Sequence, residues 1–165
     1  MHHAVLSKSL RTAALLAGLA LAMAAEAAAA PLTIKYYSLD PPPDWKVLNG
    51  PKTAKDGSVH ILLGQKNHRC SASLTVFPAS PGLAEKRARE AAKLLGGTQP
   101  VARNGQLEFA FKKMGDNGYC IVREDKQSKL LIMVIVSGDL RQADFIYSMR
   151  GDYPALVPVK PEKLW

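Results

Sequence analysis

Residues 99–136 contain four strand-like segments in succession, which are separated only by turns. The segments cover 99–103, 106–112, 119–123 and 129–136. Parallel neighbours need a crossover of a dozen or more residues, whereas antiparallel strands can be joined by a two-residue turn. The sequence therefore predicts an antiparallel sheet. Within this stretch, Asn104-Gly105 suits a type I′ hairpin turn, and residues 115–118 (GDNG) predict a second turn.

One of these segments, residues 129–136 (KLLIMVIV), is almost continuously apolar. A strand of this composition is covered on both faces, so we expect it at a central position in the sheet. Residues 59–63 and 70–77 alternate apolar and polar side chains, which predicts two further strands.

Two helices are expected beside this sheet. The first covers residues 81–95, after Ser80 as a capping residue and before a pair of glycines, and its buried side is rich in alanine. The second begins at Asp139, with Gln142 three residues later as in a capping box, and ends before Gly151. The predicted fold class is therefore α+β, with an antiparallel β-sheet flanked by two helices as in an α/β/α sandwich.

The first thirty residues have the pattern of a secretory signal peptide. Lys8 and Arg11 precede an uncharged apolar run over 12–25, and small residues with two A-x-A sites follow. The run has about fourteen residues, fewer than the roughly 20 of a membrane-spanning helix, although a retained anchor is the alternative. We expect cleavage between Ala25 and Pro31 and a periplasmic or secreted product. No later apolar run exceeds eight residues, which predicts no transmembrane segment in the mature chain.

The remaining chain of about 135 residues has room for one hydrophobic core. We expect a signal peptide over 1–30, a single α+β domain over 31–151 and an extended proline-rich tail over 152–165. The composition, 47% hydrophobic and 22% charged, excludes the disordered, collagen-like and coiled-coil classes.

The chain contains two cysteines, Cys70 and Cys120. In an oxidising compartment such a pair usually forms a disulfide, and the sequence predicts this bond. It would close a loop of about fifty residues and stabilise the fold by roughly 4 kcal/mol. Two buried free thiols are the first alternative, and redox or metal chemistry is the second.

The formal net charge is +8, and removal of residues 1–30, which hold two basic and one acidic residue, lowers it to +7. Lys86, Arg89 and Lys93 fall on one side of the first predicted helix. They are the predicted site for an anion or partner, and a solvated helix face is the alternative. Export makes nucleic acid an unfavoured partner, and favours an anionic envelope component or an acidic protein.

No pattern in the sequence predicts catalysis. His60, His68 and Cys70 approach a metal-ligand set, but a disulfide at Cys70 would remove the third ligand. A G-x-S-x-G elbow and a phosphate-binding glycine loop are both absent from the sequence. We therefore expect no catalytic residue, no cofactor and no metal.

The order of elements resembles that of the PsbP-like family, which is named for an extrinsic protein of photosystem II and has exported bacterial relatives. The resemblance covers about residues 42–150. It implies an α/β/α sandwich around an antiparallel sheet and a non-catalytic accessory, assembly or binding role. The stretches that carry it are Pro42–Trp45, the strand 71–77 with the helix 81–95, the strand 106–111 after the Asn-Gly turn, and the strand 130–138 followed by Ile146–Met149.

These observations favour an exported, non-enzymatic binding or accessory protein. Its basic surface would bind an anionic envelope component or an acidic protein. An interaction subunit of an envelope assembly is one alternative, and it would expose an apolar patch or an unpaired sheet edge. A small exported enzyme is the other alternative, and it would show convergent polar residues in a cleft.

Overall fold

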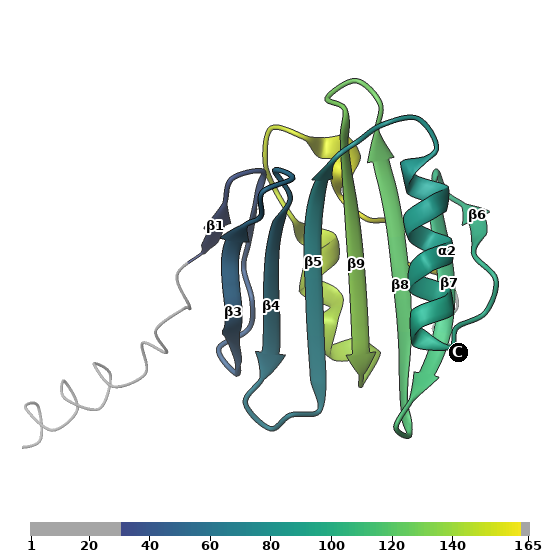
Figure 1. The fold of residues 1–165 in the computed structure, drawn as a ribbon. Coiled ribbons are helices and arrows are strands. Elements are labelled where there is room, and N and C mark those ends of the chain that lie inside the picture. Colours follow the sequence, from purple (N-terminus) through teal and green to yellow (C-terminus); the bar gives the residue numbers. More distant parts are fainter. Residues whose placement is uncertain (1–30, 163–165) are drawn as a thin grey trace, which may run out of the picture.

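The structure is a computed structural model that describes residues 31–162. Its main feature is a seven-stranded sheet in the order β3-β4-β5-β9-β8-β7-β6 (Figure 1), and every neighbouring pair is antiparallel. The predicted signal peptide, residues 1–30, lies outside the described residues. The strands are β3 (Trp45–Thr53), β4 (Val59–Gln65), β5 (Cys70–Pro78), β6 (Val101–Arg103), β7 (Gln106–Lys113), β8 (Asp116–Asp125) and β9 (Leu130–Gly138).

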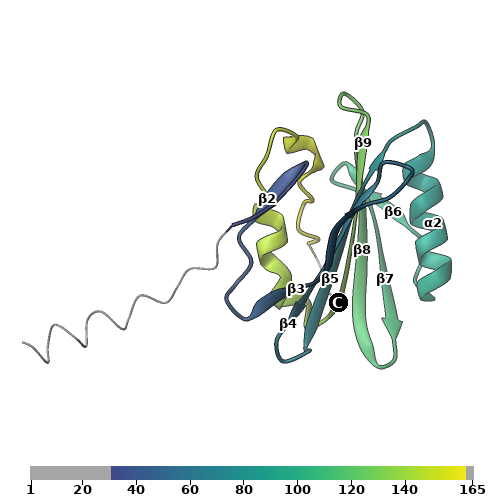
Figure 2. The same ribbon diagram turned by 60° about the vertical axis from the view of Figure 1, so that its left-hand side comes forward.

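Different kinds of structure cover the two faces of the sheet (Figure 2). Helix α2 (Leu83–Leu95) lies against one face, over β7 and β8. The other face carries the two-stranded sheet of β1 (Leu32–Ile34) and β2 (Tyr37–Leu39), and the 3₁₀ helices η1 (Leu140–Ser148) and η2 (Pro154–Leu156). The sheet thus separates two hydrophobic cores, one on each face.

The predicted fold class, an α+β sheet flanked by two helices in an α/β/α sandwich, is wrong. The protein is mostly β, with 47% strand and 19% helix. Within residues 31–162, α2 is the only α-helix, and the second predicted helix is the 3₁₀ helix η1. The face opposite α2 is covered by short strands, 3₁₀ turns and extended chain instead of a packed α-helix.

The physical reason lies at both ends of η1. Asp139 makes no capping hydrogen bond, and its carboxylate instead accepts hydrogen bonds from the side chains of Arg141 and Gln142. The aromatic and β-branched residues Phe145 to Tyr147 are typical of strands more than of helices. The segment starts with good helix formers, but its N-terminus has no side-chain cap and its second half disfavours an α-helix, so it closes into tight 3₁₀ turns.

Helix α2 begins two residues later than predicted. Gly82, in the left-handed conformation at φ 75°, stands at its N-terminus, and the predicted Ser80 side-chain cap is not formed. The predicted glycine stop is confirmed, since Gly96 at φ 65° ends the helix. The buried alanines that let the helix approach the sheet are Ala84, Ala88, Ala91 and Ala92.

The edge strand β3 escaped sequence-based prediction. Its residues show no alternation, because most of them are exposed, and the Asn49-Gly50-Pro51 segment is typical of a turn. The pairing of β3 with β4 is interrupted by two irregularities of register around this segment. The chain before β3 also contributes to the core, because Ile34, Leu39 and Tyr37 are buried.

The β6–β7 and β7–β8 turns differ in how well their residues suit a left-handed backbone. Asn104 (φ 50°) and Gly105 (φ 73°) join β6 to β7, which confirms the predicted turn. The turn predicted over residues 115–118 is wrong: Met114 (φ 53°) and Gly115 (φ 93°) form the turn, and residues 116–118 belong to β8. A left-handed conformation costs an ordinary side chain about 1–2 kcal/mol, and asparagine less.

Candidate functional site

The structure does not bring Cys70 and Cys120 together. Cys70 begins β5, Cys120 lies in β8, and β9 runs between these strands. Two strand spacings amount to about 9.6 Å, more than the roughly 7 Å that a disulfide allows between Cα atoms. The two side chains also enter different hydrophobic cores. The predicted disulfide is therefore wrong, and both cysteines are buried free thiols.

The predicted basic residues Lys86, Arg89 and Lys93 are all exposed on α2. They are three and four positions apart, so they share one side of the helix. Lys86 Nζ lies 3.9 Å from Glu90 Oε1, whereas Arg89 and Lys93 take part in no ion pair with the described residues. We call these three residues the basic stripe.

Arg87, on another side of α2, has a structural role. Its guanidinium lies 4.8 Å from the centre of the Phe77 ring, which is a cation–π contact, and 3.6 Å from Glu90 Oε2. The contact with Phe77 links α2 to β5, and the ion pair with Glu90 lies within α2, so Arg87 is not part of the basic stripe.

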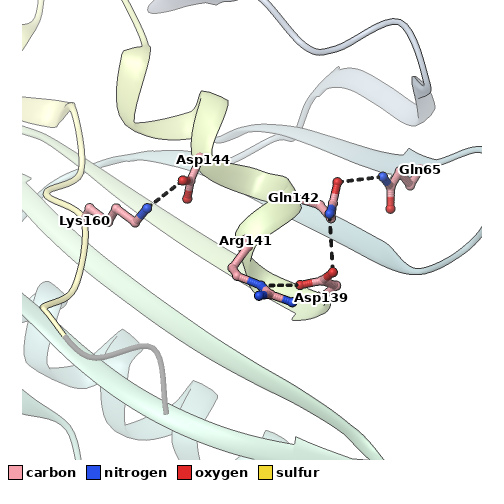
Figure 3. Close-up of polar contacts among 6 residues, drawn as sticks. All are labelled: Gln65, Asp139, Arg141, Gln142, Asp144 and Lys160. Atoms are coloured by element: carbon pink, nitrogen blue, oxygen red, sulfur yellow. Dashed lines mark hydrogen bonds and ion pairs between the residues drawn. The ribbon is translucent and has the colours of Figure 1, made fainter.

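A chain of polar contacts joins η1 to the main sheet (Figure 3). Gln65 Nε2 donates to Gln142 Oε1 at 3.2 Å, and Gln142 Nε2 donates to Asp139 Oδ2 at 3.3 Å. Gln65 also donates to Asp44 Oδ2 at 2.6 Å. Hydrogen bonds from Gln142 and then Arg141 hold the pKa of the exposed Asp139 carboxyl below its usual value. These contacts fix η1 on the sheet and leave an ionised carboxylate at its start.

A second polar cluster fastens the chain after η2 to β7. The Gln106 side chain donates to Val159 O at 2.7 Å and accepts from Val159 N–H at 2.9 Å, which clamps the main chain at this point. Gln106 Nε2 also donates to the buried Glu108 carboxylate at 2.7 Å. Lys160 pairs with Asp144 of η1 at 2.6 Å (Figure 3). The residues of the predicted tail up to 162 therefore contact the domain.

The hydroxyls of Tyr119 in β8 and Tyr147 in η1 form a hydrogen bond. Burial raises the pKa of both phenols, for Tyr147 to about 12. Both phenols therefore stay protonated near neutral pH.

The two histidines after residue 31 lie apart from these clusters. His60 Nδ1 shares a hydrogen bond with Thr75 Oγ1 at 3.0 Å, and burial, then the charge of Lys52, lowers the pKa of His60. His68 lies in the turn after β4, close in sequence to Cys70. Among residues 31–162, no three His, Cys, Asp or Glu side chains form a group that could hold a metal ion.

An open pocket of about 700 Å³ lies between the start of α2 and the turn that joins β8 to β9. Lys126 and Lys129 line it together with Glu85 and Glu124, so its charged residues balance. This balance gives the pocket no preference for anions or cations.

A surface at the other end of α2, which we call the basic end, does not follow from the sequence patterns. It consists of Lys93 and Leu94 in the last turn of α2, and Lys112, Lys113 and Met114 at the β7–β8 turn. The predicted strand 106–112 and the predicted turn 115–118 both leave out Met114, so neither pattern indicates that Met114 forms the tip of the hairpin. The signal that could have found it is Met-Gly where a hairpin turn favours Asn-Gly, directly after two lysines.

No family model and no curated protein matches the chain. Among solved structures, it is similar to a protein of Bacteroides thetaiotaomicron VPI-5482 whose crystal structure was determined at 1.50 Å resolution, with 12% identity and a TM-score of 0.45. The match covers 70% of this chain and 45% of that chain, so this chain spans less than half of the matched protein. A similarity of this size carries no argument about function, and the PsbP-like resemblance stays a prediction.

Proposed function

We propose that the protein is exported and acts without catalysis, by binding an anionic component of the cell envelope through the basic stripe. The observation that carries this proposal is the position of Lys86, Arg89 and Lys93 on the free side of a helix whose opposite side is buried on the sheet. Because Arg89 and Lys93 have no acidic partner among residues 31–162, their charge is available to an anion.

The contacts of three polar side chains support a binding role. Gln65 links β4 to η1, Gln106 clamps the chain near Val159, and His60 bonds Thr75. Each of these groups stabilises the fold through its contacts. Binding through the stripe requires none of them to act as an acid or a base.

The proposed location depends on the signal-peptide pattern of residues 1–30. In the part of the chain that the structure covers, no helix has the length and apolarity needed to cross a membrane. Intact-mass measurement of the protein from its native host tests export: we expect a first residue between Ala25 and Pro31, and a mass that includes Met1 to Ala24 would contradict it.

Charge reversal tests the stripe, with retention on a heparin column as the probe for anion binding. Lys86→Glu, Arg89→Glu and Lys93→Glu together should lower the salt concentration of elution, because electrostatic attraction is lost. The stripe is exposed, so the fold should tolerate the changes.

A matched control changes the net charge equally at the other edge of the sheet. Lys46, Lys52 and Lys55 are exposed on and beside β3, and their replacement by Glu should affect elution less. Equal losses in both triple variants would mean that net charge alone decides retention, and this would contradict the proposal. Failure of the parent protein to bind would contradict it as well.

A further inference from the structure

Two apolar side chains are far more exposed than any other large apolar side chain among residues 31–162. Met114 is 97% exposed and Leu94 is 81% exposed, and Leu48 follows at 47%. Both belong to the basic end. Single exposed apolar residues are ordinary on protein surfaces, but these two lie at one end of the molecule (Figure 1) and beside lysines.

The two residues lie at the same end of the molecule. The chain after α2 joins β7 there, because Thr98 N–H donates to Ala110 O at 2.8 Å. A shallow cavity at this junction is lined by Gly96, Gly97, Lys112 and Asn117, among others. Figure 1 shows the end of α2 and the β7–β8 turn on the same side of the molecule, opposite the β8–β9 turn.

Each exposed apolar residue directly follows lysine. Lys93 precedes Leu94, and Lys112 and Lys113 precede Met114. No ion pair with another described residue involves these lysines, although Asp116 stands opposite Lys113 in the β7–β8 register. The basic end therefore combines free positive charge with exposed apolar side chains.

The fold does not account for Met114. Its side chain contributes nothing to either core, and its left-handed backbone is unfavourable for methionine. In the equivalent β6–β7 turn, the left-handed positions are occupied by Asn104 and Gly105, which suit them better. A residue that breaks a local preference without a packing gain is expected at functional positions.

We propose that the basic end binds the surface of an anionic lipid bilayer. Met114 and Leu94 enter the boundary between headgroups and acyl chains, and the three lysines contact the anionic headgroups. A soluble anionic polymer would engage the lysines but leave both apolar side chains in water, so the combination favours a bilayer. This inference rests on the proposed function and names the anionic component, with Lys93 common to the stripe and the basic end.

Co-sedimentation with vesicles of phosphatidylglycerol and phosphatidylcholine tests this inference. Vesicles of phosphatidylcholine alone should bind the protein weakly. Lys112→Gln with Lys113→Gln should lower the affinity for anionic vesicles about 25-fold, from about fivefold per lysine near the surface. The matched control is Lys126→Gln with Lys129→Gln at the opposite end, which removes the same charge and should change the affinity less than about twofold.

A second variant separates binding from folding. Met114→Asn should lower the vesicle affinity about fivefold, since an apolar side chain is lost from the bilayer. It should also raise Tm by about 3 °C, because asparagine tolerates the left-handed turn. Reduced binding by a more stable protein cannot arise from misfolding.

The outcomes distinguish this inference from the proposed function. Unchanged binding by Met114→Asn, or equal losses in the two double-lysine variants, would overturn the bilayer inference. If the parent binds heparin through the stripe but not vesicles, the bilayer inference is wrong and the proposed function stands. Binding to neither probe would contradict both.

Discussion

The thiols of Cys70 and Cys120 are buried in different cores, and this burial lowers their reactivity. Burial raises the pKa of Cys70 to about 12, and burial also raises that of Cys120. Since the thiolate is the reactive form, we expect no labelling of the native protein by a thiol reagent at pH 8. Unfolding without reductant should expose two reactive thiols. A count of zero under these conditions would restore the disulfide.

At this scale, the sequence identifies buried positions better than it identifies contacts. Strand alternation correctly assigns Cys70 to a buried face. The alternation does not show which core that face contacts, because in a sheet covered on both sides the residues that point to either face are buried. The exposed lysines and arginine of α2 follow directly from helical periodicity, whereas the basic end depends on one turn that local patterns misplace by a residue or two.

At the scale of elements, we expect two glycines in one row across the sheet to differ in their tolerance of substitution by alanine. Gly64 and Gly118 lie in a row that passes through Ser71 and Ser137. A Cβ at Gly118 would overlap the buried Phe111 ring, so Gly118→Ala should lower the free energy of unfolding by about 2 kcal/mol.

The matched variant is Gly64→Ala. Its Cβ would meet the end of the half-exposed Leu48 side chain, at 2.5 Å from Cδ1, and this side chain can rotate away. We expect a change within about 0.5 kcal/mol in urea unfolding. Equal destabilisation by the two substitutions would contradict this account of the row.

Elements with strong periodicity can be predicted from the sequence, and elements shaped by tertiary contacts cannot. The apolar run 129–136 predicts a central strand, and β9 is indeed fourth of the seven strands. Helix α2 follows from its alanine spacing. The exposed edge strand β3 has no pattern to detect. The 3₁₀ helix η1 lacks a side-chain cap, and side-chain contacts to β4 and the final segment fix its position.

For the whole molecule, the buried phenols and thiols predict a loss of stability in alkali. Burial raises the pKa of Tyr37, Tyr119, Tyr147 and both cysteines, so the folded state keeps protons that the unfolded state releases from about pH 9 upward. The stability they confer is complete below pH 9 and is lost as the pH rises toward 12, by up to about 1.4 kcal/mol per unit for each group.

The urea midpoint, measured between pH 7 and pH 11, checks this prediction. It should stay level up to about pH 9 and then fall. Cys70→Ala removes one titrating group and should make the fall less steep, whatever its effect at pH 7. A midpoint that stays constant to pH 11 would contradict the role of these groups.

The position of β9 has a consequence for the order in which the fold can form. β9 pairs with β5 on one side and β8 on the other, so it joins two three-stranded meanders that come earlier in the chain. Because the chain is made from its N-terminus, both meanders are present before β9. Each meander has a free edge toward the missing strand until residue 138 has appeared. The sheet, and with it the layer that separates the two cores, is completed only when β9 has inserted between β5 and β8.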